Sequence, residues 1–352
     1  MMDRRTFSKG LGLAAGGAAA SLAGLASLPA ASAATPGPTP APAVPAVTPG
    51  AHASFTSLKR VRAGLLDIGY AEAGPARGPV VICLHGWPYD IHSFVDVAPL
   101  LAAQGYRVIV PYLRGHGTTR FLSSRTFRNA QQSAIALDII ALMDALRIEK
   151  AVLAGFDWGS RTADIIAALW PERCEALVSV SGYLITSLEA NLKPLPPKAE
   201  YAWWYQYYFA TERGRLAMED ETKRNELNRL VWDTVSPTWS FDDATFERTA
   251  AAFDNPDYAA IVIHNYRWRL SLAQGERRYD GLENRLAVRP AITAPTIVLD
   301  ADRDPFTAGS DSSYRDRFTG AYEYRTLAGI GHNVPQEAPT AFAQAVLDVA
   351  RF

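Results

Sequence analysis

The sequence is poor in cysteine and carries no metal-binding pattern. Its 352 residues include only two cysteines, Cys83 and Cys174, and both lie in or beside apolar runs. We interpret them as buried free thiols, because cysteine is among the most frequently buried residue types. A disulfide between them is the alternative in an oxidising compartment. No cysteines and histidines share the spacing of a metal site, so we expect neither a metal nor another cofactor.

The sequence also lacks an excess of charge of either sign. Its 35 lysines and arginines nearly balance 36 aspartates and glutamates, which gives a formal net charge of -1, and the basic residues are scattered. Such a chain offers no basic patch to a nucleic acid. With 48% hydrophobic and 20% charged residues it is neither disordered nor fibrous in composition. We therefore expect a globular protein that acts on a small molecule.

The N-terminal residues have the composition of an export signal. Arg4 and Arg5 precede an aromatic residue and a lysine, residues 11–28 are rich in Gly, Ala and Leu, and a small-x-small sequence ends at Ala33. This order predicts a twin-arginine signal peptide over residues 1–33, cleaved after Ala33. Glycines interrupt its apolar middle, which argues against a transmembrane helix. We expect the mature protein in the periplasm or outside the cell, without a membrane anchor.

The segment after the signal is predicted to be a linker. Residues 34–54 contain six prolines among alanine and threonine. With nothing apolar to pack, this composition is typical of an extended tether. The folded part of the chain should therefore begin near residue 55.

From residue 80 onward, short β-branched runs alternate with longer stretches of helical periodicity. This alternation is typical of a mostly parallel sheet covered on both faces, as in doubly wound α/β domains. The predicted strands are 80–84, 106–110, 151–155, 177–180 and 296–299, and the predicted helices are 94–103, 131–146 and 161–169.

The alternation is interrupted between residues 183 and 293. This segment is rich in helix formers, Trp and Tyr, and it contains no clear strand. Insertions of this kind follow the carboxyl end of a strand, where open α/β sheets bind their ligands. We therefore predict a helical cap over 183–293 that covers the site and excludes water. The core domain is then formed by 55–182 and 294–352.

A sharp turn with an aspartate at its centre is the main chemical motif. Residues 155–159, Gly-Phe-Asp-Trp-Gly, follow an apolar strand and precede a helical stretch, which is the arrangement of a nucleophile elbow. The alternative is that Asp157 only caps the following helix. The sequence His-Gly-Trp-Pro at 85–88 favours the nucleophile, because it follows a strand where this arrangement places an oxyanion-hole amide. The predicted oxyanion donors are the backbone N–H groups of Trp87 and Trp158.

A histidine and an aspartate further along the chain complete a candidate triad. His332 lies in a glycine-containing loop before the last helical stretch, and Asp300, Asp302 and Asp304 follow the last predicted strand. The resulting order of nucleophile, acid and histidine is that of an elbow-type hydrolase. We choose Asp304 as the acid because the loop has left the strand there, with Asp302 as the alternative. His264, in the predicted cap, is a candidate pocket residue.

The aspartate at the nucleophile position determines the class of reaction. A carboxylate that attacks an acyl group forms an anhydride, whereas attack on a saturated carbon forms an ester that water can cleave. No Gly-x-Ser-x-Gly sequence occurs elsewhere to provide a serine nucleophile. The expected substrates are therefore epoxides or alkyl halides.

Four short segments make the chain resemble the epoxide hydrolases of the α/β-hydrolase superfamily over nearly all of residues 55–352. In that family two cap tyrosines hold the epoxide oxygen, the first followed by Gln and the second by Arg, as Tyr205 and Tyr266 are here. The resemblance implies the α/β-hydrolase fold, with a small apolar epoxide and water as substrates. The segments that carry it are His85-Gly86-Trp87-Pro88, Phe156-Asp157-Trp158-Gly159, Tyr205-Gln206-Tyr207-Tyr208-Phe209 and Gly331-His332.

The expected reaction is the opening of an epoxide to a vicinal diol through a covalent ester. Asp157 attacks one epoxide carbon, Tyr205 and Tyr266 donate to the oxygen, and His332, oriented by Asp304, activates the water that cleaves the ester. The residues expected to line the substrate pocket are Trp87, Trp158, Tyr205, Tyr266 and His264.

Departures from the pattern of the family leave two alternatives open. Fluoroacetate dehalogenases place an arginine directly after the nucleophile, where this chain has Trp158, and its nearest arginine is Arg161. Haloalkane dehalogenases do place Trp after the aspartate, but usually have Asn or Glu where this chain has Trp87. One alternative is thus a dehalogenase acting on a haloalkane or haloacid with the same nucleophile. The other is a non-catalytic ligand-binding protein with this fold.

Overall fold

The computed structural model describes residues 43–46, 54–55, 57–306 and 314–352. The predicted signal peptide lies outside these residues, as does most of the predicted linker. Val44 corrects one expectation, because it is buried against the core and its N–H donates to Gln344 Oε1 at 3.0 Å. The linker therefore has an apolar side chain that packs. Within the described residues, no helix has both the length and the apolar character needed to cross a membrane.

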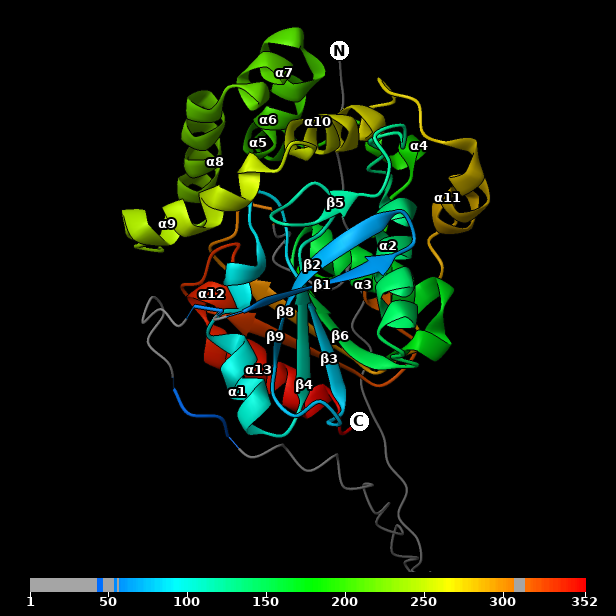
Figure 1. Cartoon of the computed structure of the whole chain (residues 1–352), viewed down its shortest axis with the longest axis vertical. Coiled ribbons are helices and arrows are strands. Elements are labelled where there is room, and N and C mark those ends of the chain that lie inside the picture. Colours follow the sequence, from blue (N-terminus) through cyan, green and yellow to red (C-terminus); the bar gives the residue numbers. More distant parts are fainter. Residues whose placement is uncertain (1–42, 47–53, 56, 307–313) are drawn as a thin grey trace, which may run out of the picture. The chain divides into compact units, whose positions relative to one another are not determined.

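A twisted sheet of nine strands, counted over the described residues, forms the centre of the molecule (Figure 1). Its strand order is β1-β2-β4-β3-β6-β7-β8-β9, with β5 paired to β2. β1 and β4 each pair antiparallel with β2, and the pairs from β4 to β9 are parallel. The bounds are β1 (Leu58–Ala63), β2 (Leu66–Ala73), β3 (Val80–Leu84), β4 (Arg107–Pro111), β5 (Arg120–Phe121), β6 (Ala151–Gly155), β7 (Cys174–Val180), β8 (Thr296–Ala301) and β9 (Tyr322–Leu327).

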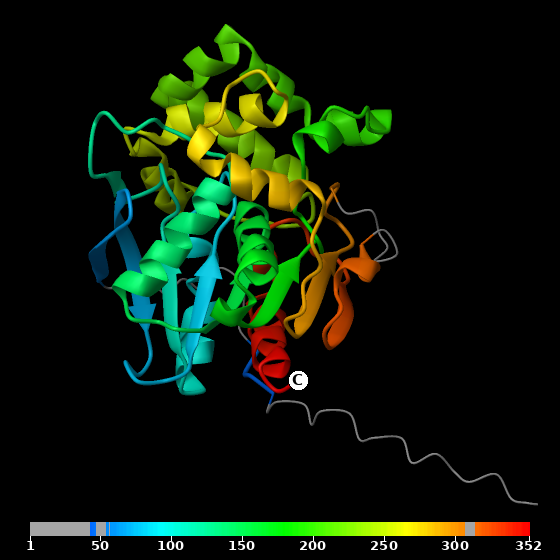
Figure 2. The ribbon, with the colours of Figure 1, turned by 90° about the vertical axis from the view of Figure 1, so that its right-hand side faces the viewer.

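Helices cover both faces of this sheet, which confirms the predicted doubly wound α/β arrangement. Helices α1 and α13 pack against each other, and so do α2 and α3 (Figure 2). The central strands β3 and β6 are almost continuous apolar runs because both of their faces are buried. The helices of the core are α1 (Val97–Ala103), α2 (Gln132–Ala145), α3 (Trp158–Leu169), α12 (Val334–Glu337) and α13 (Pro339–Val349).

The chain between β7 and β8 is helical and lies over the carboxyl ends of the parallel strands (Figures 1 and 2). Several of its helices begin with side-chain caps, for example Asp220, which accepts from the N–H of Lys223 at the start of α8. Its helices are α4 (Leu188–Asn191), α5 (Pro197–Ala202), α6 (Trp204–Ala210), α7 (Glu212–Glu219), α8 (Glu221–Val235), α9 (Asp243–Ala250), α10 (Tyr258–Arg269) and α11 (Asp280–Ala287).

Four strands were not predicted from the sequence, namely β1, β2, β5 and β9. β1 lies at the edge of the sheet and has mostly exposed side chains, so it lacks the apolar run used to recognise a strand. β9 is the opposite edge and is only half-buried. The sheet therefore begins at Leu58, ahead of the alternating pattern that starts at residue 80. Cys83 and Cys174 are free and buried, as predicted.

Candidate active site

Asp157 occupies the sharp turn between β6 and α3. Its backbone has φ 51° and ψ -121°, a conformation that side-chain-bearing residues rarely adopt. The turn brings the strand and helix so close that a Cβ on Gly155 would lie 2.5 Å from the backbone of Gly159. A Cβ on Gly159 would lie 1.9 Å from the carbonyl oxygen of Leu84. Small residues on both sides of Asp157 are thus a steric requirement, and the elbow holds its carboxylate at the carboxyl end of the sheet.

The loop after β3 closes on this carboxylate from the other side. The backbone N–H of Trp87 donates to Asp157 Oδ1 at 2.8 Å. Gly86 allows the approach, since a Cβ there would lie 2.5 Å from the Cβ of Asp157. Trp158 is the first residue of α3, where backbone N–H groups have no acceptor inside the helix. The two predicted oxyanion donors thus flank Asp157, and the first already bonds to it.

His332 lies next to the other carboxylate oxygen of Asp157. Its Nε2 is 3.7 Å from Asp157 Oδ2, and its Nδ1 is 2.6 Å from Asp304 Oδ2. Asp304 is buried and also accepts from the N–H of Phe306. Asp302, the alternative acid, instead accepts from the N–H of Gly329 in a more exposed position. The structure therefore brings Asp304 and not Asp302 to the histidine.

The electrostatics of this group favour the ionised form of Asp157. Burial alone would raise the pKa of Asp157, but His332, Arg161 and the N–H of Trp87 outweigh it and lower that pKa. Burial would likewise lower the pKa of His332, but Asp304 and Asp157 outweigh it and raise that pKa to about 10. At neutral pH the resting site therefore contains an imidazolium between two carboxylates.

The loop that carries His332 is held by a buried glutamate. Glu337 accepts from the N–H groups of Gly331 and Asn333 and from the hydroxyl of Ser236. Ser236 Oγ in turn accepts from the N–H of His332 at 3.0 Å. Since Ser236 follows α8, the histidine is positioned by the helical segment as well as by the core. Neither Glu337 nor Ser236 could be recognised as part of the site from the sequence alone.

Tyr205 and Tyr266 reach the same cavity from two different helices. Tyr205 lies on α6 and Tyr266 on α10, and their ring centroids are 5.4 Å apart with the planes nearly perpendicular. Both line one cavity together with Asp157 and His332. We call this cavity the catalytic cavity. Burial raises the pKa of both phenols. Both rings therefore enter the cavity as neutral groups able to donate.

Three predicted pocket residues are not among the described residues that line the catalytic cavity. The rings of Trp87 and Trp158 pack against Tyr266, with centroid distances of 5.3 and 6.1 Å. His264 was wrongly placed in the pocket. It lies two residues from Tyr266 on α10, which points it to the opposite side of the helix, and its ring nitrogens bond to the backbone at Ala130 and Gln274.

Several residues of the catalytic cavity carried no sequence signal. Trp203 and Phe306 stack with ring centroids 5.0 Å apart, and Phe306 also packs edge-on to His332. Arg161 and Arg269 line the cavity as well. Of these residues, only Arg161 could be recognised from the sequence, because it lies one helical turn after Asp157.

No group of three or more His, Cys, Asp or Glu side chains within the described ranges is arranged to hold a metal ion.

Comparison with known proteins agrees with this arrangement. The chain matches the α/β hydrolase fold family over residues 79–339. It is 31% identical over 250 residues to epoxide hydrolase B of Mycobacterium tuberculosis, covering 67% of each chain. It is 25% identical to a haloalkane dehalogenase of Mycobacterium marinum, covering 73% of this chain and 79% of the relative.

A solved structure is more similar still. The crystal structure of a proposed epoxide hydrolase from Klebsiella pneumoniae superimposes with a TM-score of 0.83 at 57% sequence identity, covering 85% of this chain and 98% of that one. Together with the elbow and the mostly parallel sheet, these matches confirm the predicted fold. The chain is a hydrolase of the α/β-hydrolase fold family and belongs to its epoxide hydrolase branch.

Proposed function

We propose that the protein opens an epoxide to a vicinal diol through a covalent ester on Asp157. The observation that carries the proposal is the different environment of the two carboxylate oxygens. Oδ1 accepts from the N–H of Trp87, whereas Oδ2 faces His332. Tyr205 and Tyr266 line the same cavity, and they could meet an oxygen leaving the attacked carbon. In this proposal Oδ2 is the nucleophile, and Oδ1 is the oxygen held by a backbone N–H.

The first step forms the ester. Asp157 Oδ2 attacks an epoxide carbon, the carbon–oxygen bond of the ring breaks, and a proton from Tyr205 or Tyr266 passes to the oxygen as its charge develops. The resulting phenolate recovers a proton from the imidazolium of His332 by way of water. This transfer leaves the histidine neutral.

The second step uses the change of charge that the first step produced. The ester has no negative charge, so one of the two carboxylates that raise the pKa of His332 is gone. The neutral imidazole, still held by Asp304, takes a proton from a water that attacks the carbonyl carbon of Asp157. The N–H of Trp87, already on Oδ1, stabilises the oxyanion, with the N–H of Trp158 as the second donor. Collapse releases the diol and restores the carboxylate and imidazolium.

The named relatives include both epoxide hydrolases and a haloalkane dehalogenase. The two tyrosines favour the epoxide, because a departing halide needs no proton whereas an opening epoxide does. The identity to epoxide hydrolase B is also higher than the identity to the dehalogenase. We therefore propose dehalogenation only as the alternative, to be separated by experiment.

Trapping of the ester tests this proposal directly. His332→Gln should react with a panel of aryl and alkyl epoxides and accumulate an adduct of substrate mass, measured by mass spectrometry of the intact protein. The double variant Asp157→Asn/His332→Gln should show no adduct. Absence of an adduct on His332→Gln with any epoxide, combined with halide release from bromoalkanes by the wild type, would contradict the proposal and support the dehalogenase.

We also propose that residues 1–33 direct export by the twin-arginine route. Changing Arg4 and Arg5 to lysine should retain the full-length precursor in the cytoplasm of a host that has this pathway, while Lys9→Arg should leave export intact. Immunoblots of cell fractions measure the outcome. Export of the double-lysine variant at the wild-type level would contradict the proposal.

A further inference from the structure

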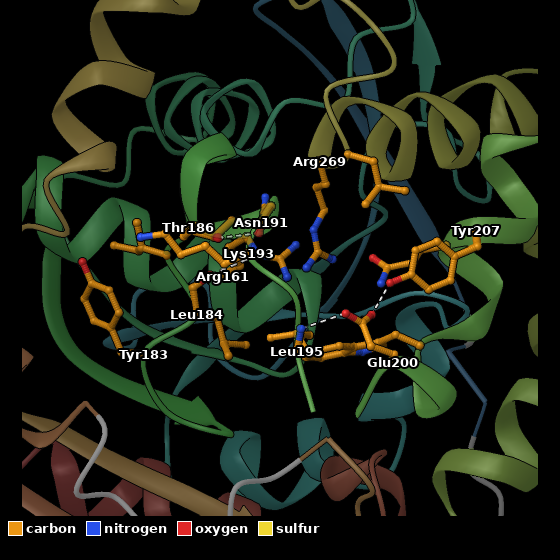
Figure 3. Close-up of a pocket in the computed structure, with 15 residues that line it drawn as sticks. Arg161, Tyr183, Leu184, Thr186, Asn191, Lys193, Leu195, Glu200, Tyr207 and Arg269 are labelled. Carbon is orange, nitrogen blue, oxygen red and sulfur yellow. Dashed lines mark hydrogen bonds between the residues drawn. The ribbon is translucent and has the colours of Figure 1, made fainter. Parts of the chain in front are cut away.

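Two arginines line both the catalytic cavity and a second cavity, which we call the outer cavity. The outer cavity lies between α4, α5, α6 and the end of α10, and Figure 3 shows its lining residues. Arg161, Arg269, Leu184 and Trp203 line both cavities. Arg161 comes from α3 and Arg269 is the last residue of α10. In Figure 3 the guanidinium ends of the two arginines point toward one another.

Neither arginine forms an ion pair with a carboxylate among the described residues. Arg161 Nε donates to the carbonyl oxygen of Leu184 at 3.2 Å, and Arg269 Nε is buried without a hydrogen-bond partner in the described part of the chain. Arg114, also buried, shows how this protein satisfies such a group elsewhere. Its Nε and Nη2 bond to both carboxylate oxygens of Asp138, at 2.6 and 2.7 Å. By contrast, the guanidinium groups of Arg161 and Arg269 have N–H donors at the cavity that no carboxylate of the described residues accepts.

The pairing of two positive charges is unfavourable unless an anion joins them. Burial and the neighbouring Arg269 lower the pKa of Arg161 to about 10, while Asp157 acts in the opposite direction. An anion bound between the guanidinium groups would relieve both the repulsion and the loss of hydration. A guanidinium presents parallel N–H donors that match the two oxygens of a carboxylate, so a carboxylate fits between the two groups.

We propose that Arg161 and Arg269 form a carboxylate-binding subsite, and that the substrate is an epoxide with a carboxylate group close to its ring. The inference rests on the proposed function for the epoxide part alone. Arg161 lines the same cavity as Asp157, and its charge helps to lower the pKa of that carboxyl group. The substrate carboxylate and the attacked carbon should therefore lie close together in the molecule. The remainder of the substrate packs on Trp203 and Leu184.

Binding of an unreactive acid tests the subsite without requiring turnover. Titration calorimetry should show that the wild type binds cinnamate at least about tenfold more tightly than cinnamamide, which has the same shape without the charge. Arg161→Gln and Arg269→Gln should each remove this preference. Arg125→Gln, a change of an exposed arginine away from the cavity, is the matched control and should retain it.

Turnover supplies the second readout. The ratio of kcat/KM for 3-phenyloxirane-2-carboxylate to that for its primary amide should fall about tenfold to a hundredfold in each glutamine variant. Arg269 lies on α10, so its variant keeps the test informative if Arg161→Gln does not fold. Equal binding of cinnamate and cinnamamide by the wild type, or a preference retained by both glutamine variants, overturns the subsite. A preference for cinnamate in a protein that opens no epoxide would leave the subsite standing and reject the epoxide reaction.

Discussion

The buried carboxyl group of Asp164 should make the stability of the protein depend on pH. Asp164 lies on α3, and its Oδ2 accepts from the N–H of Leu184 at 2.7 Å. Burial raises its pKa from 3.8 to about 7, although the bond from the N–H of Leu184 and the charge of Arg161 oppose the rise. The folded protein thus holds this proton more tightly than the unfolded chain does.

The sign and size of the effect follow from this difference. The stabilising contribution of the protonated group is complete below pH 3.8 and is lost as the pH rises through about 7. The whole difference corresponds to roughly 4 kcal/mol, of which roughly 2 kcal/mol is lost between pH 5 and pH 7. Asp164→Asn keeps an acceptor for Leu184 and removes the titration, so the stability of the variant should lack this loss.

Urea unfolding of the wild type and Asp164→Asn at pH 5, 6, 7 and 8 measures the effect. The free energy of unfolding of the wild type, relative to that of the variant, should fall by roughly 2 kcal/mol from pH 5 to pH 7 and only slightly further by pH 8. Asp144→Asn is the control, since Asp144 is exposed and paired with Arg173. A difference between wild type and Asp164→Asn that stays constant over this range would refute the reasoning.

Four further variants test the predicted catalytic geometry. Asp304→Asn removes the charge that holds the histidine, so single-turnover hydrolysis of the ester should slow by about a hundredfold to ten-thousandfold; an unchanged rate would exclude Asp304 as the acid. Gly86→Ala places a Cβ 2.5 Å from the Cβ of Asp157, so turnover should be lost while circular dichroism still shows the fold; normal turnover would contradict the tight approach. Tyr205→Phe and Tyr266→Phe should each lower kcat for epoxides by about a hundredfold or more, and neither change should affect release of halide from a bromoalkane.

The sequence was most informative where chemistry and local structure coincide. The turn around Asp157 requires small residues at fixed positions next to a strand and a helix, so it can be read from five residues. The α/β arrangement could be predicted because buried parallel strands are continuous apolar runs. The choice of Asp304 over Asp302 relied on where a loop leaves its strand, which is also a local property.

The rest of the site depends on contacts between distant parts of the chain. Trp203, Phe306 and Arg269 meet at the cavity although each lies in an unremarkable local sequence. His264 was misplaced because it was assigned by its nearness to Tyr266 along the chain, whereas a helix turns neighbours two residues apart to opposite sides. Edge strands such as β1 escaped prediction for a related reason, since their exposed side chains have no apolar pattern to detect.

The end of α8 has a consequence for how a substrate enters. Trp232 donates from its indole nitrogen to the carbonyl oxygen of Pro88 at 2.7 Å, and Ser236, one turn later, bonds to the backbone of His332. The loop of Pro88 and the loop of His332 are thus both held by the end of α8. An outward movement of α8 would therefore displace the catalytic residues that these loops carry. The entrance for the substrate should therefore lie beside Leu184 and Trp203, which line both cavities, so that a ligand can enter and leave while α8 keeps both loops in place.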